Sequence, residues 1–363
     1  MTDVIDTPDE LDVDAYAEKV FGDVLGAMNV AAITLGVRLG WYDALAAADS
    51  MTSVELAAAT DSDERYAREW LEQQTVTGYL RLEQASDDGT LRRYSLGPAG
   101  AAVMADRDSL AFMAPFATFV SALGKSMDAL VDVYRSGEGI GWHEHGDGAR
   151  CGQAAANRPM FLHQLANEYL ASIPDVADAL AAGGRVADVG CGMGWSSIGI
   201  ARAFPAAVVH GFDIDEPSVD HARKNAAESG VSERVRFDTV DVGELEEGGY
   251  DLVLALECIH DMPDPVSVLT SMRAMAGDDG AVIVMDERVP DVFTGASDDP
   301  VEQIFYGFSL ICCLPDGRNA EESVATGTVM RRPTFERYAT QAGFDSVEVL
   351  PIENDFFRFY RLR

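Results

Sequence analysis

The stretch VADVGCGMG at residues 186–194 constrains the fold of this chain more than any other feature. An apolar run, typical of a β-strand, ends at Asp188 and is followed by a glycine-rich loop and then by the helical pattern of WSSIGIARAF. The glycines are Gly190, Gly192 and Gly194. A loop of this kind lets backbone amides approach a nucleotide-like ligand, and the helix amino terminus favours the same point. A dinucleotide fingerprint would place its third glycine where Trp195 stands, so the spacing argues against that class.

Acidic residues follow the strands that the sequence predicts next. VVHGF is expected to end at Asp213, RVRFDTV leads to Asp241, and YDLVLAL ends at Glu257. A carboxylate at the tip of the second strand can accept hydrogen bonds from both ribose hydroxyls of an adenosine. Strands alternating with helices therefore predict an α/β, doubly wound sheet that binds its ligand at the carboxyl edge. The alternative for each single aspartate is an acidic loop end without a ligand.

The rest of the chain completes this sheet and adds a long insertion. AVIVMDERV is expected to be a fifth strand ending at Asp286 and Glu287, and the closing RPTFERYATQAGFDSVEVLPIENDFFRFYRLR reads as a helix and a strand hairpin. Residues 289–330, between them, are long enough to form a lid over a site. The candidate substrate contacts are Arg288, Phe305, Tyr306 and Phe308. Plain core packing is the alternative for the aromatic stripe.

The first hundred residues have the order of a winged helix. Apolar residues at helical spacing fill 14–39, and WYDALAAA, TSVELAAAT and DSDERYAREWLEQQTVTGYL predict three more helices. Thr52 or Ser53 is a plausible N-cap, with Glu55 nearby. YLRLEQ and LRRYSL predict a hairpin, and GPAGAAVM predicts another helix. The expected domains are 14–105, a helical linker with an active-site loop at 106–183, and the sheet domain at 184–363.

Charge argues against nucleic acid as a partner. The chain carries 61 acidic residues against 27 Lys and Arg, a formal net charge of −34. The segment that would read DNA has two arginines, Arg65 and Arg68, among a larger number of acids, which is the wrong sign for a major groove. An acidic surface spread along the whole chain is typical of proteins adapted to a high-salt cytoplasm, where screening removes self-repulsion. An ordinary acidic protein is the alternative, and melting in low and high salt separates the two.

The sequence contains no strong signal for export, for membrane insertion or for metal binding. The start of the chain has neither a basic segment nor an apolar core, so no signal peptide is expected, and no apolar run of about 18 residues predicts a membrane span. The five cysteines have no framework spacing and read as reduced thiols in a cytoplasm. His143 and His145 lack a third dedicated ligand, so no metal is predicted, and the interruption RSGEGIGWHEHGDGARCG is expected to be a loop.

The glycine motif with its acidic strand ends resembles motif I of class I S-adenosylmethionine (SAM)-dependent methyltransferases, whose sheet is Rossmann-like and seven-stranded. GGRVADVGCGMGWSS, LECIHDMPDPVSVL and ATGTVMRRPTF further resemble a group of winged-helix methyltransferases of unassigned substrate, common in actinobacteria. In the similar small-molecule O-methyltransferases the winged helix is a dimerisation domain, which implies a homodimer. The resemblance assigns SAM contacts to Asp188, Gly190, Gly192, Gly194, Trp195, Asp213, Ile214, Asp241, Val242 and Glu257.

A general base for methyl transfer is expected just beyond the fourth strand. His260 titrates near neutral pH and is the preferred base, with Glu257 or Asp261 orienting it. A packing histidine beneath the cofactor is the alternative. Plant-type O-methyltransferases use a histidine base, although here Glu257 and Cys258 depart from that pattern.

The sequence therefore predicts a cytoplasmic enzyme that moves a methyl group from SAM to an oxygen, or a nitrogen, of a hydrophobic small molecule. A SAM-responsive winged-helix transcriptional regulator is the second hypothesis. A methyltransferase acting on protein or nucleic acid is the third, and the net charge opposes the nucleic-acid form.

Overall fold

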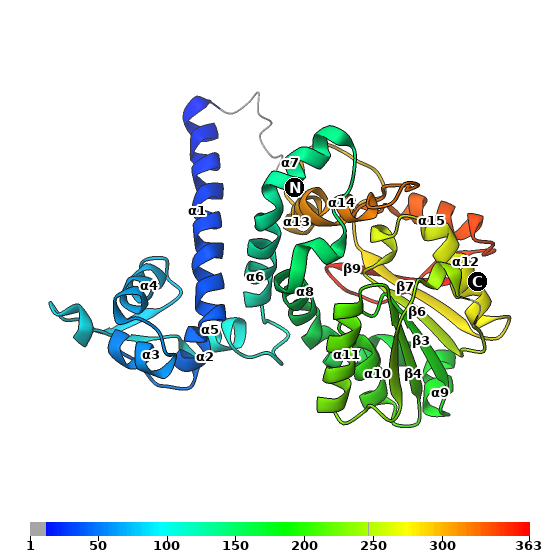
Figure 1. The fold of residues 1–363 in the computed structure, drawn as a ribbon, viewed down its shortest axis with the longest axis horizontal. Coiled ribbons are helices and arrows are strands. Elements are labelled where there is room, and N and C mark those ends of the chain that lie inside the picture. The colour runs from blue at the N-terminus through cyan, green and yellow to red at the C-terminus, as the bar shows by residue number, and fades with distance from the viewer. Residues whose placement is uncertain (1–11, 246) are drawn as a thin grey trace. The chain divides into compact units, whose positions relative to one another are not determined.

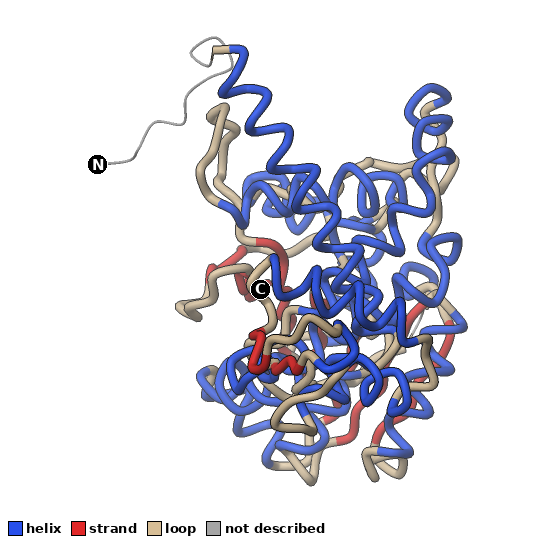
Figure 2. The backbone as a smooth tube through the Cα atoms, turned by 90° about the vertical axis from the view of Figure 1, so that its left-hand side faces the viewer, coloured by secondary structure: helices blue, strands red, loops and turns tan. Residues whose placement is uncertain are grey.

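We describe the protein from a computed structural model, which places residues 12–245 and 247–363. The chain divides into two compact units. The larger unit comprises Leu123–Gly146 and Met160–Arg363, and the smaller unit comprises the described residues up to Ala122 together with Asp147–Pro159. Helices make up most of the chain (Figure 2). The expected absence of a signal peptide rests largely on residues 1–11, which lie outside the described residues.

The larger unit is built on the doubly wound sheet that the sequence predicts. Its strands are β3 (Arg185–Val189), β4 (Val208–Asp213), β5 (Val235–Thr239), β6 (Leu252–Leu256), β7 (Ala281–Glu287), β8 (Val347–Val349) and β9 (Phe357–Leu362). They lie in the order β5-β4-β3-β6-β7-β9-β8 (Figure 1). Strands β3 to β7 run parallel, and β9 is antiparallel to both of its neighbours, so β8 runs in the same sense as β7. From β3 the chain adds β4 and β5 on one side of the sheet, and it then crosses over to add β6 and β7 on the other side. Ligands bind where the strand order reverses in this way, so the crevice between β3 and β6 is the expected ligand position.

Alternate residues of the strands enter two separate cores. Val186 on β3 belongs to a core shared with Ile198 and Val219, whereas its neighbour Ala187 belongs to a core shared with Leu269 and Phe335. These partners lie on helices α10 (Trp195–Ala203), α11 (Glu216–Glu228), α12 (Pro265–Ala276) and α15 (Arg332–Gln341). Burial on both faces explains why the parallel strands are continuous apolar runs. A further helix of this unit is α9 (Pro174–Ala181).

The smaller unit has the predicted winged-helix order. Its elements are α1 (Val13–Arg38), α2 (Trp41–Ala46), α3 (Ser53–Ala59), α4 (Glu64–Val76), β1 (Arg81–Gln84), β2 (Arg93–Ser95), α5 (Gly97–Met104) and α6 (Ala114–Leu123). Thr52 caps α3 in a capping box with Glu55, as expected. Gly36 lets α1 approach this core closely, because a β-carbon there would lie 2.5 Å from the Trp70 ring.

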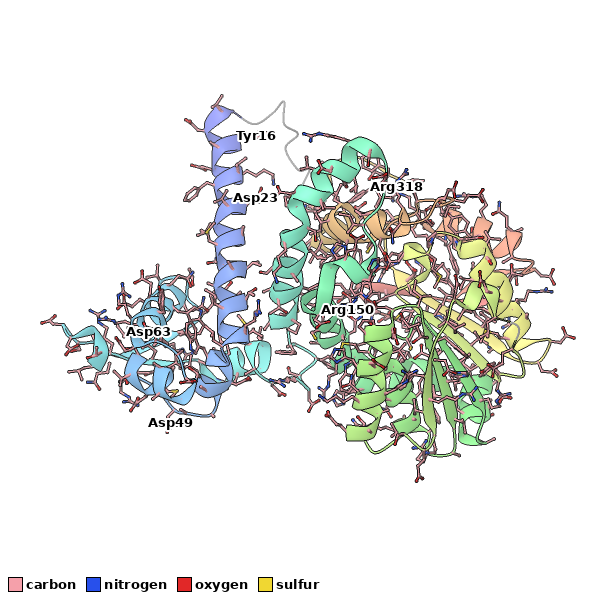
Figure 3. The ribbon with its side chains drawn as sticks, viewed as in Figure 1. Tyr16, Asp23, Asp49, Asp63, Arg150 and Arg318 are labelled. Carbon is pink, nitrogen blue, oxygen red and sulfur yellow. The ribbon has the colours of Figure 1, made fainter. Side chains whose placement is uncertain are left out.

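The amino-terminal half of α1 is apolar and exposed, and it reaches past α2–α5 (Figures 1 and 3). The exposed apolar side chains of α1 are Val13, Tyr16, Val20, Phe21, Val24, Leu25, Met28 and Leu35. Among the described residues, α1 alone is long and apolar enough to cross a membrane, by length and composition only. The expectation that no segment spans a membrane stays a prediction, because length and composition alone do not place a helix in a bilayer.

One predicted loop is helical. The interruption after α7 (Met127–Ser136) forms a short 3₁₀ turn, η3 (Trp142–His145), and then helix α8 (Gly146–Met160). The glycines that suggested a loop serve close packing instead, because a β-carbon on Gly152 would lie 2.8 Å from Phe119 of α6. A π-helix, η4 (Phe161–Tyr169), a turn, η5 (Leu170–Ser172), and α9 follow. The insertion after β7 contains α13 (Pro300–Phe308), a second π-helix η8 (Ser309–Cys313) and α14 (Leu314–Gly317).

Candidate active site

The glycine loop adopts a backbone that other residues rarely accept. Gly190, Gly192 and Gly194 have φ angles of +67°, +50° and +80°. Gly194 is the N-cap of α10, and a β-carbon there would lie 2.6 Å from the Phe237 ring, so packing as well as φ requires glycine. Gly192 differs, because nothing lies within 4 Å of the position that its β-carbon would take. The middle of the loop is therefore the part that is open to a ligand.

Asp213 is held at the tip of β4 beside this opening. Its Oδ2 accepts a hydrogen bond from the Gly192 amide at 2.8 Å, and its Oδ1 accepts one from the Asp215 amide at 2.9 Å. Burial raises the pKa of Asp213 to about 6, although these two amide donors lower it. The backbone therefore fixes the direction of the carboxylate at the sheet edge, as the sequence predicts.

Asp188 lies beneath the loop. It is 1% exposed, and its Oδ2 accepts hydrogen bonds from the hydroxyls of Ser196 and Ser197, each at 2.6 Å. Burial raises its pKa, and the two hydroxyls act in the opposite direction. Asp188 thus ties β3 to the first turn of α10 and supports the loop, whereas a direct contact with a ligand remains a prediction.

The other predicted cofactor contacts lie around the same strand ends. Ile214, next to Asp213, is 71% exposed, which is unusual for an isoleucine at the end of a buried strand. Asp241 caps a short turn, η6 (Val242–Glu244), by accepting from the Gly243 amide, and Val242 is buried. Trp195 is the first residue of α10.

Glu257 has strained backbone geometry. Its φ is +56°, a value uncommon for a residue with a side chain, and its amide donates to Met285 O at 2.8 Å. Strain of this kind concentrates at functional sites, and here it turns the chain sharply from β6 into η7 (Ile259–Asp261).

His260 lies on that turn between carboxylates on both sides of its ring. Its Nδ1 is 3.0 Å from Asp286 Oδ1 and 2.9 Å from Glu287 Oε2, and its Nε2 is 3.3 Å from Asp261 Oδ1. The ring is 2% exposed. Burial alone would lower its pKa, but Asp261, Glu287 and Asp286 raise the pKa of His260 well above its ordinary value. Burial also raises the pKa of Glu287, although His260 acts in the opposite direction.

Sequence reasoning found His260 and Asp261 but missed the role of Asp286 and Glu287. It placed both at the sheet edge without connecting them to the histidine. Parallel pairing of β6 with β7 brings them together, because Leu256, just before the turn, pairs with Met285, just before the two acids. Adjacent acids at the end of the neighbouring strand were the signal that could have predicted the pairing.

The insertion after β7 is hydrogen-bonded directly to the turn that carries His260. The amide of Gly327 donates to His260 O at 3.1 Å, and the amide of Val324 donates to Pro263 O at 3.0 Å. A β-carbon on Gly317 would lie 3.1 Å from Asp261 O. This part of the insertion therefore packs directly against the turn that carries His260.

The four predicted substrate contacts, Arg288 and three aromatic residues of the insertion, differ in burial and in their contacts within the protein. Phe305 is buried, with its ring 6.5 Å from that of Phe356. The hydroxyl of Tyr306 accepts a hydrogen bond from Arg331 at 2.9 Å. Arg288 donates to Asn354 O at 2.9 Å, and Phe308 is half-buried. A role of these four residues in binding an acceptor remains a prediction.

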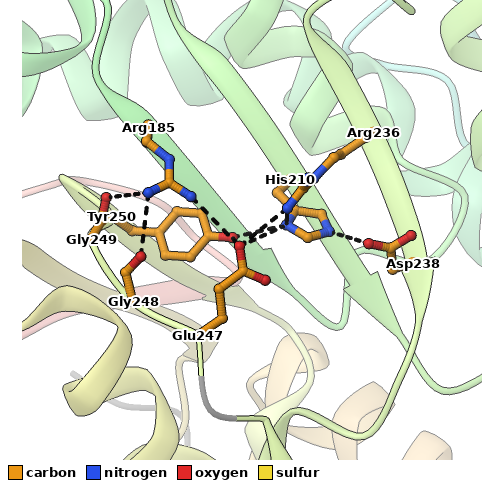
Figure 4. Close-up of polar contacts among 8 residues, drawn as sticks. All are labelled: Arg185, His210, Arg236, Asp238, Glu247, Gly248, Gly249 and Tyr250. Carbon is orange, nitrogen blue, oxygen red and sulfur yellow. Dashed lines mark hydrogen bonds and ion pairs between the residues drawn. The ribbon is translucent and has the colours of Figure 1, made fainter.

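A second buried histidine, His210 on β4, belongs to a separate polar network (Figure 4). Its Nε2 lies 2.7 Å from Asp238, and its Nδ1 lies 2.8 Å from the Tyr250 hydroxyl and 2.7 Å from Arg236. Because Arg236 can only donate, Nδ1 is the acceptor and Nε2 carries the hydrogen. Burial lowers the pKa of His210, in agreement with a neutral ring. This network joins β4, β5 and the segment before β6. The pKa of His210 is lowered, whereas the pKa of His260, the other buried histidine of this sheet, is raised.

Comparison with known proteins finds family models that match both parts of the chain. Residues 180–308 match the family model of a methyltransferase domain, and residues 27–105 match that of an Rv2258c-like winged helix-turn-helix domain. A ubiquinone biosynthesis O-methyltransferase of Bordetella bronchiseptica is 40% identical over 124 residues, which are 33% of this chain and 49% of that protein. The chain thus spans about half the length of the curated relatives that it matches first.

Solved structures resemble the chain over nearly its whole length. Mitomycin 7-O-methyltransferase has a TM-score of 0.68 at 21% identity, covering 96% of this chain and 98% of that one. Human N-acetylserotonin methyltransferase, solved with SAM, has a TM-score of 0.70 at 15% identity, covering 98% and 99%. At these identities the likeness concerns the fold. Residues 27–105 are therefore similar to an Rv2258c-like winged helix-turn-helix domain, and residues 180–308 are similar to a methyltransferase domain.

Proposed function

We propose that this protein is a SAM-dependent methyltransferase that moves a methyl group to an oxygen, or less favourably a nitrogen, of a hydrophobic small molecule. One observation carries the proposal: the same sheet edge holds the glycine loop with Asp213 and, across the β3–β6 crevice, the His260 cluster. The glycine loop with Asp213 suits the binding of an adenosine, and the His260 cluster suits the removal of a proton from an acceptor.

The residues present fit SAM. The Asp213 carboxylate is directed by two backbone amides and can accept both ribose hydroxyls. The open face at Gly192 leaves room for close approach, and the exposed Ile214 side chain offers an apolar surface to an adenine ring. Asp241 would lie near the adenine amino group, as the family resemblance implies. When bound, SAM supplies a methyl group that its sulfonium already activates.

The chain's own residues then have to position the acceptor and manage its proton. His260 receives the acceptor's proton at Nε2, while Asp286 and Glu287 hold Nδ1 and stabilise the imidazolium that forms. Asp261 lies beside Nε2 and is more exposed than the ring, so it faces the acceptor. Holding nucleophile and methyl group in line, away from water, accounts for most of the remaining rate.

The winged-helix regulator is disfavoured. The candidate recognition helix α4 carries Glu64, Glu69 and Glu72, and its two arginines pair with acids of the same helix. In the similar methyltransferases this domain serves dimerisation. We therefore propose that the exposed half of α1 is covered by a second copy of the chain, forming a homodimer. Free thiols at all five cysteines favour a cytoplasmic location, and the net charge of −34 suits high salt.

Calorimetry and label transfer test the proposal. Titration with SAM and with S-adenosylhomocysteine (SAH) should give saturable heat, and labelled SAM with a phenolic library should give labelled acceptor. Absence of heat from both ligands would remove the assignment. Specific retardation of DNA from upstream of the gene at physiological salt would instead favour the regulator.

A further inference from the structure

Cys313, the last residue of the π-helix η8, lies beside the turn that carries His260. The ligand atoms of His260, Asp261 and Cys313 all lie within 4.8 Å of one another. Packing of α14 against the turn supports this contact, because a β-carbon on Gly317 would lie 3.1 Å from Asp261 O. An imidazole, a carboxylate and a thiol from two distant parts of the chain therefore meet at one point.

The His260 ring has the orientation of a metal-binding histidine. Its Nδ1 faces Asp286 at 3.0 Å and Glu287 at 2.9 Å, and its Nε2 faces Asp261 at 3.3 Å. Histidines that bind a metal through one ring nitrogen almost always donate the hydrogen of the other to a carboxylate or a carbonyl group. The carboxylates at Nδ1 provide that acceptor, so Nε2 is the nitrogen that is available to an ion.

Asp261 offers a buried oxygen that the protein itself does not satisfy. Its Oδ1 has no hydrogen-bond partner among residues 12–245 and 247–363, and its approach to His260 Nε2 lies outside hydrogen-bond geometry. A buried acceptor without a partner costs free energy. A cation bound between this oxygen and Nε2 would remove that cost.

The sulfur of Cys313 is supported by the neighbouring thiol. Hydrogen bonding with Cys313, together with burial, raises the pKa of Cys312 well above its ordinary value. Cys312 is 3% exposed and keeps its hydrogen, which it donates to the Cys313 sulfur. A thiol that binds a metal loses its own hydrogen, so Cys313 is the sulfur suited to coordination. It is partly exposed, as Asp261 is, so an ion can reach both.

We infer that His260 Nε2, Asp261 and Cys313 form a binding site for one zinc ion, with a fourth position open. Zn²⁺ binds nitrogen, carboxylate oxygen and thiolate at about 2.0–2.3 Å, and small rotations of the two partly exposed side chains bring the three atoms within that reach. A thiolate ligand favours Zn²⁺ over Mg²⁺ and Ca²⁺.

Zinc at this site excludes proton transfer by His260. Nε2 has a single lone pair, so it cannot bind zinc and also accept the acceptor's proton, and zinc displaces any proton already there. Zn²⁺ is therefore an inhibitor of methyl transfer. This consequence rests on the proposed function, whereas the zinc site itself does not.

Cobalt spectroscopy on the full chain tests the site, because Co²⁺ substitutes for Zn²⁺ and reports a sulfur ligand directly. Titration with Co²⁺ should give a thiolate-to-cobalt charge-transfer band that saturates at one ion per chain, and Zn²⁺ should abolish it. Cys313→Ser should lose the band and bind Zn²⁺ at least about 100-fold more weakly in a chelator competition. Cys151→Ser, at an exposed cysteine of α8, is the matched control and should keep both.

Absence of the band in the wild type, or its persistence in Cys313→Ser, would overturn the site. SAH titration verifies that Cys313→Ser is folded, and Asp261→Asn is a second variant that should weaken Zn²⁺ binding by at least about tenfold. An unchanged zinc affinity in Asp261→Asn would equally count against the site.

With an acceptor that takes up label from SAM, saturating Zn²⁺ should stop the transfer and a chelator should restore it. Transfer that continues at saturating Zn²⁺ would overturn the inhibition. Failure of SAH to bind the wild type would overturn the proposed function, and the cobalt titration would still decide the zinc site, so the two failures are distinguishable.

Discussion

Gly190 lies so close to Cys258 that a β-carbon on it would come within 2.7 Å of the Cys258 sulfur. The two residues stand at the ends of β3 and β6, the strands between which the topology places the ligand crevice. The sulfur donates in turn to Val189 O at 3.3 Å. Contact between the glycine loop and the turn that carries His260 therefore fixes these two segments relative to each other.

Replacing Gly190 by alanine should destabilise the protein by about 2–4 kcal/mol, since the positive φ and the contact with Cys258 both penalise a side chain. Gly230→Ala is the matched control, because Gly230 has φ +70° with nothing within 4 Å. It should cost only about 1–2 kcal/mol in urea unfolding. Equal losses in the two variants would show that the close contact is unimportant.

Asp213→Ala should weaken SAH binding by about 1–3 kcal/mol, because its half-buried carboxylate is the expected partner of the ribose hydroxyls. Calorimetry of the two proteins side by side measures the change. Asp220→Ala, at an exposed aspartate of α11 in the same unit, is the control and should bind SAH normally. An unaltered affinity in Asp213→Ala would contradict the ribose assignment.

SAH affinity should fall as pH drops below about 6. The pKa of Asp213 is about 6, raised by burial and by the charges of Asp215 and Asp188. Only the ionised form accepts from both ribose hydroxyls, so the dissociation constant should be nearly constant above pH 7 and rise about tenfold per pH unit below 6. Asp213→Asn should remove this dependence. SAH titrations between pH 5 and 8 measure this dependence. A dissociation constant that does not change with pH would indicate that another group holds the ribose.

His260→Gln should lower kcat by about 10²–10⁴-fold without changing the SAH dissociation constant, because the ring acts on the acceptor's proton. Since carboxylates raise the pKa of His260, the neutral ring becomes more abundant as pH rises, and wild-type kcat/KM should rise with it. His210→Gln, at the other buried histidine of the sheet, is the control for loss of a buried imidazole. Retained turnover in His260→Gln would assign the residue a packing role.

Phe21→Asp combined with Leu25→Asp should convert a dimer into a monomer. Both side chains are exposed on α1, and burial against a second copy would stabilise the dimer by about 1.5–3 kcal/mol for each. Light scattering measures the mass, at several salt concentrations. Val76→Asp, at an exposed apolar residue of α4, should leave the dimer intact. A wild-type monomer at every salt concentration would refute the proposed interface.

Much of the fold could be predicted because its signals are local. Apolar runs such as LVLAL are long enough to identify buried parallel strands, and Thr52 with Glu55 marks the start of α3. The glycine loop and Asp213 are readable for the same reason, since a sharp turn after a strand requires particular residues at adjacent positions.

Predictions from local sequence were wrong or incomplete where a residue far away in the chain determines the structure. Gly146–Gly152 looked like a loop and is helical, because its glycines allow α8 to approach Phe119 of α6. Asp286 and Glu287 looked like strand-end acids, and they reach His260 because β6 pairs with β7 in register.

Periodicity and backbone constraints act over a few residues, so the amino-acid sequence was enough to predict the strands of the sheet, the glycine loop and the acid that follows the second of these strands. The carboxylates that surround His260 could be identified only from the folded structure. Electrostatic energy depends on distance in space, and residues that lie far apart along the chain become neighbours only when the sheet and its insertion assemble.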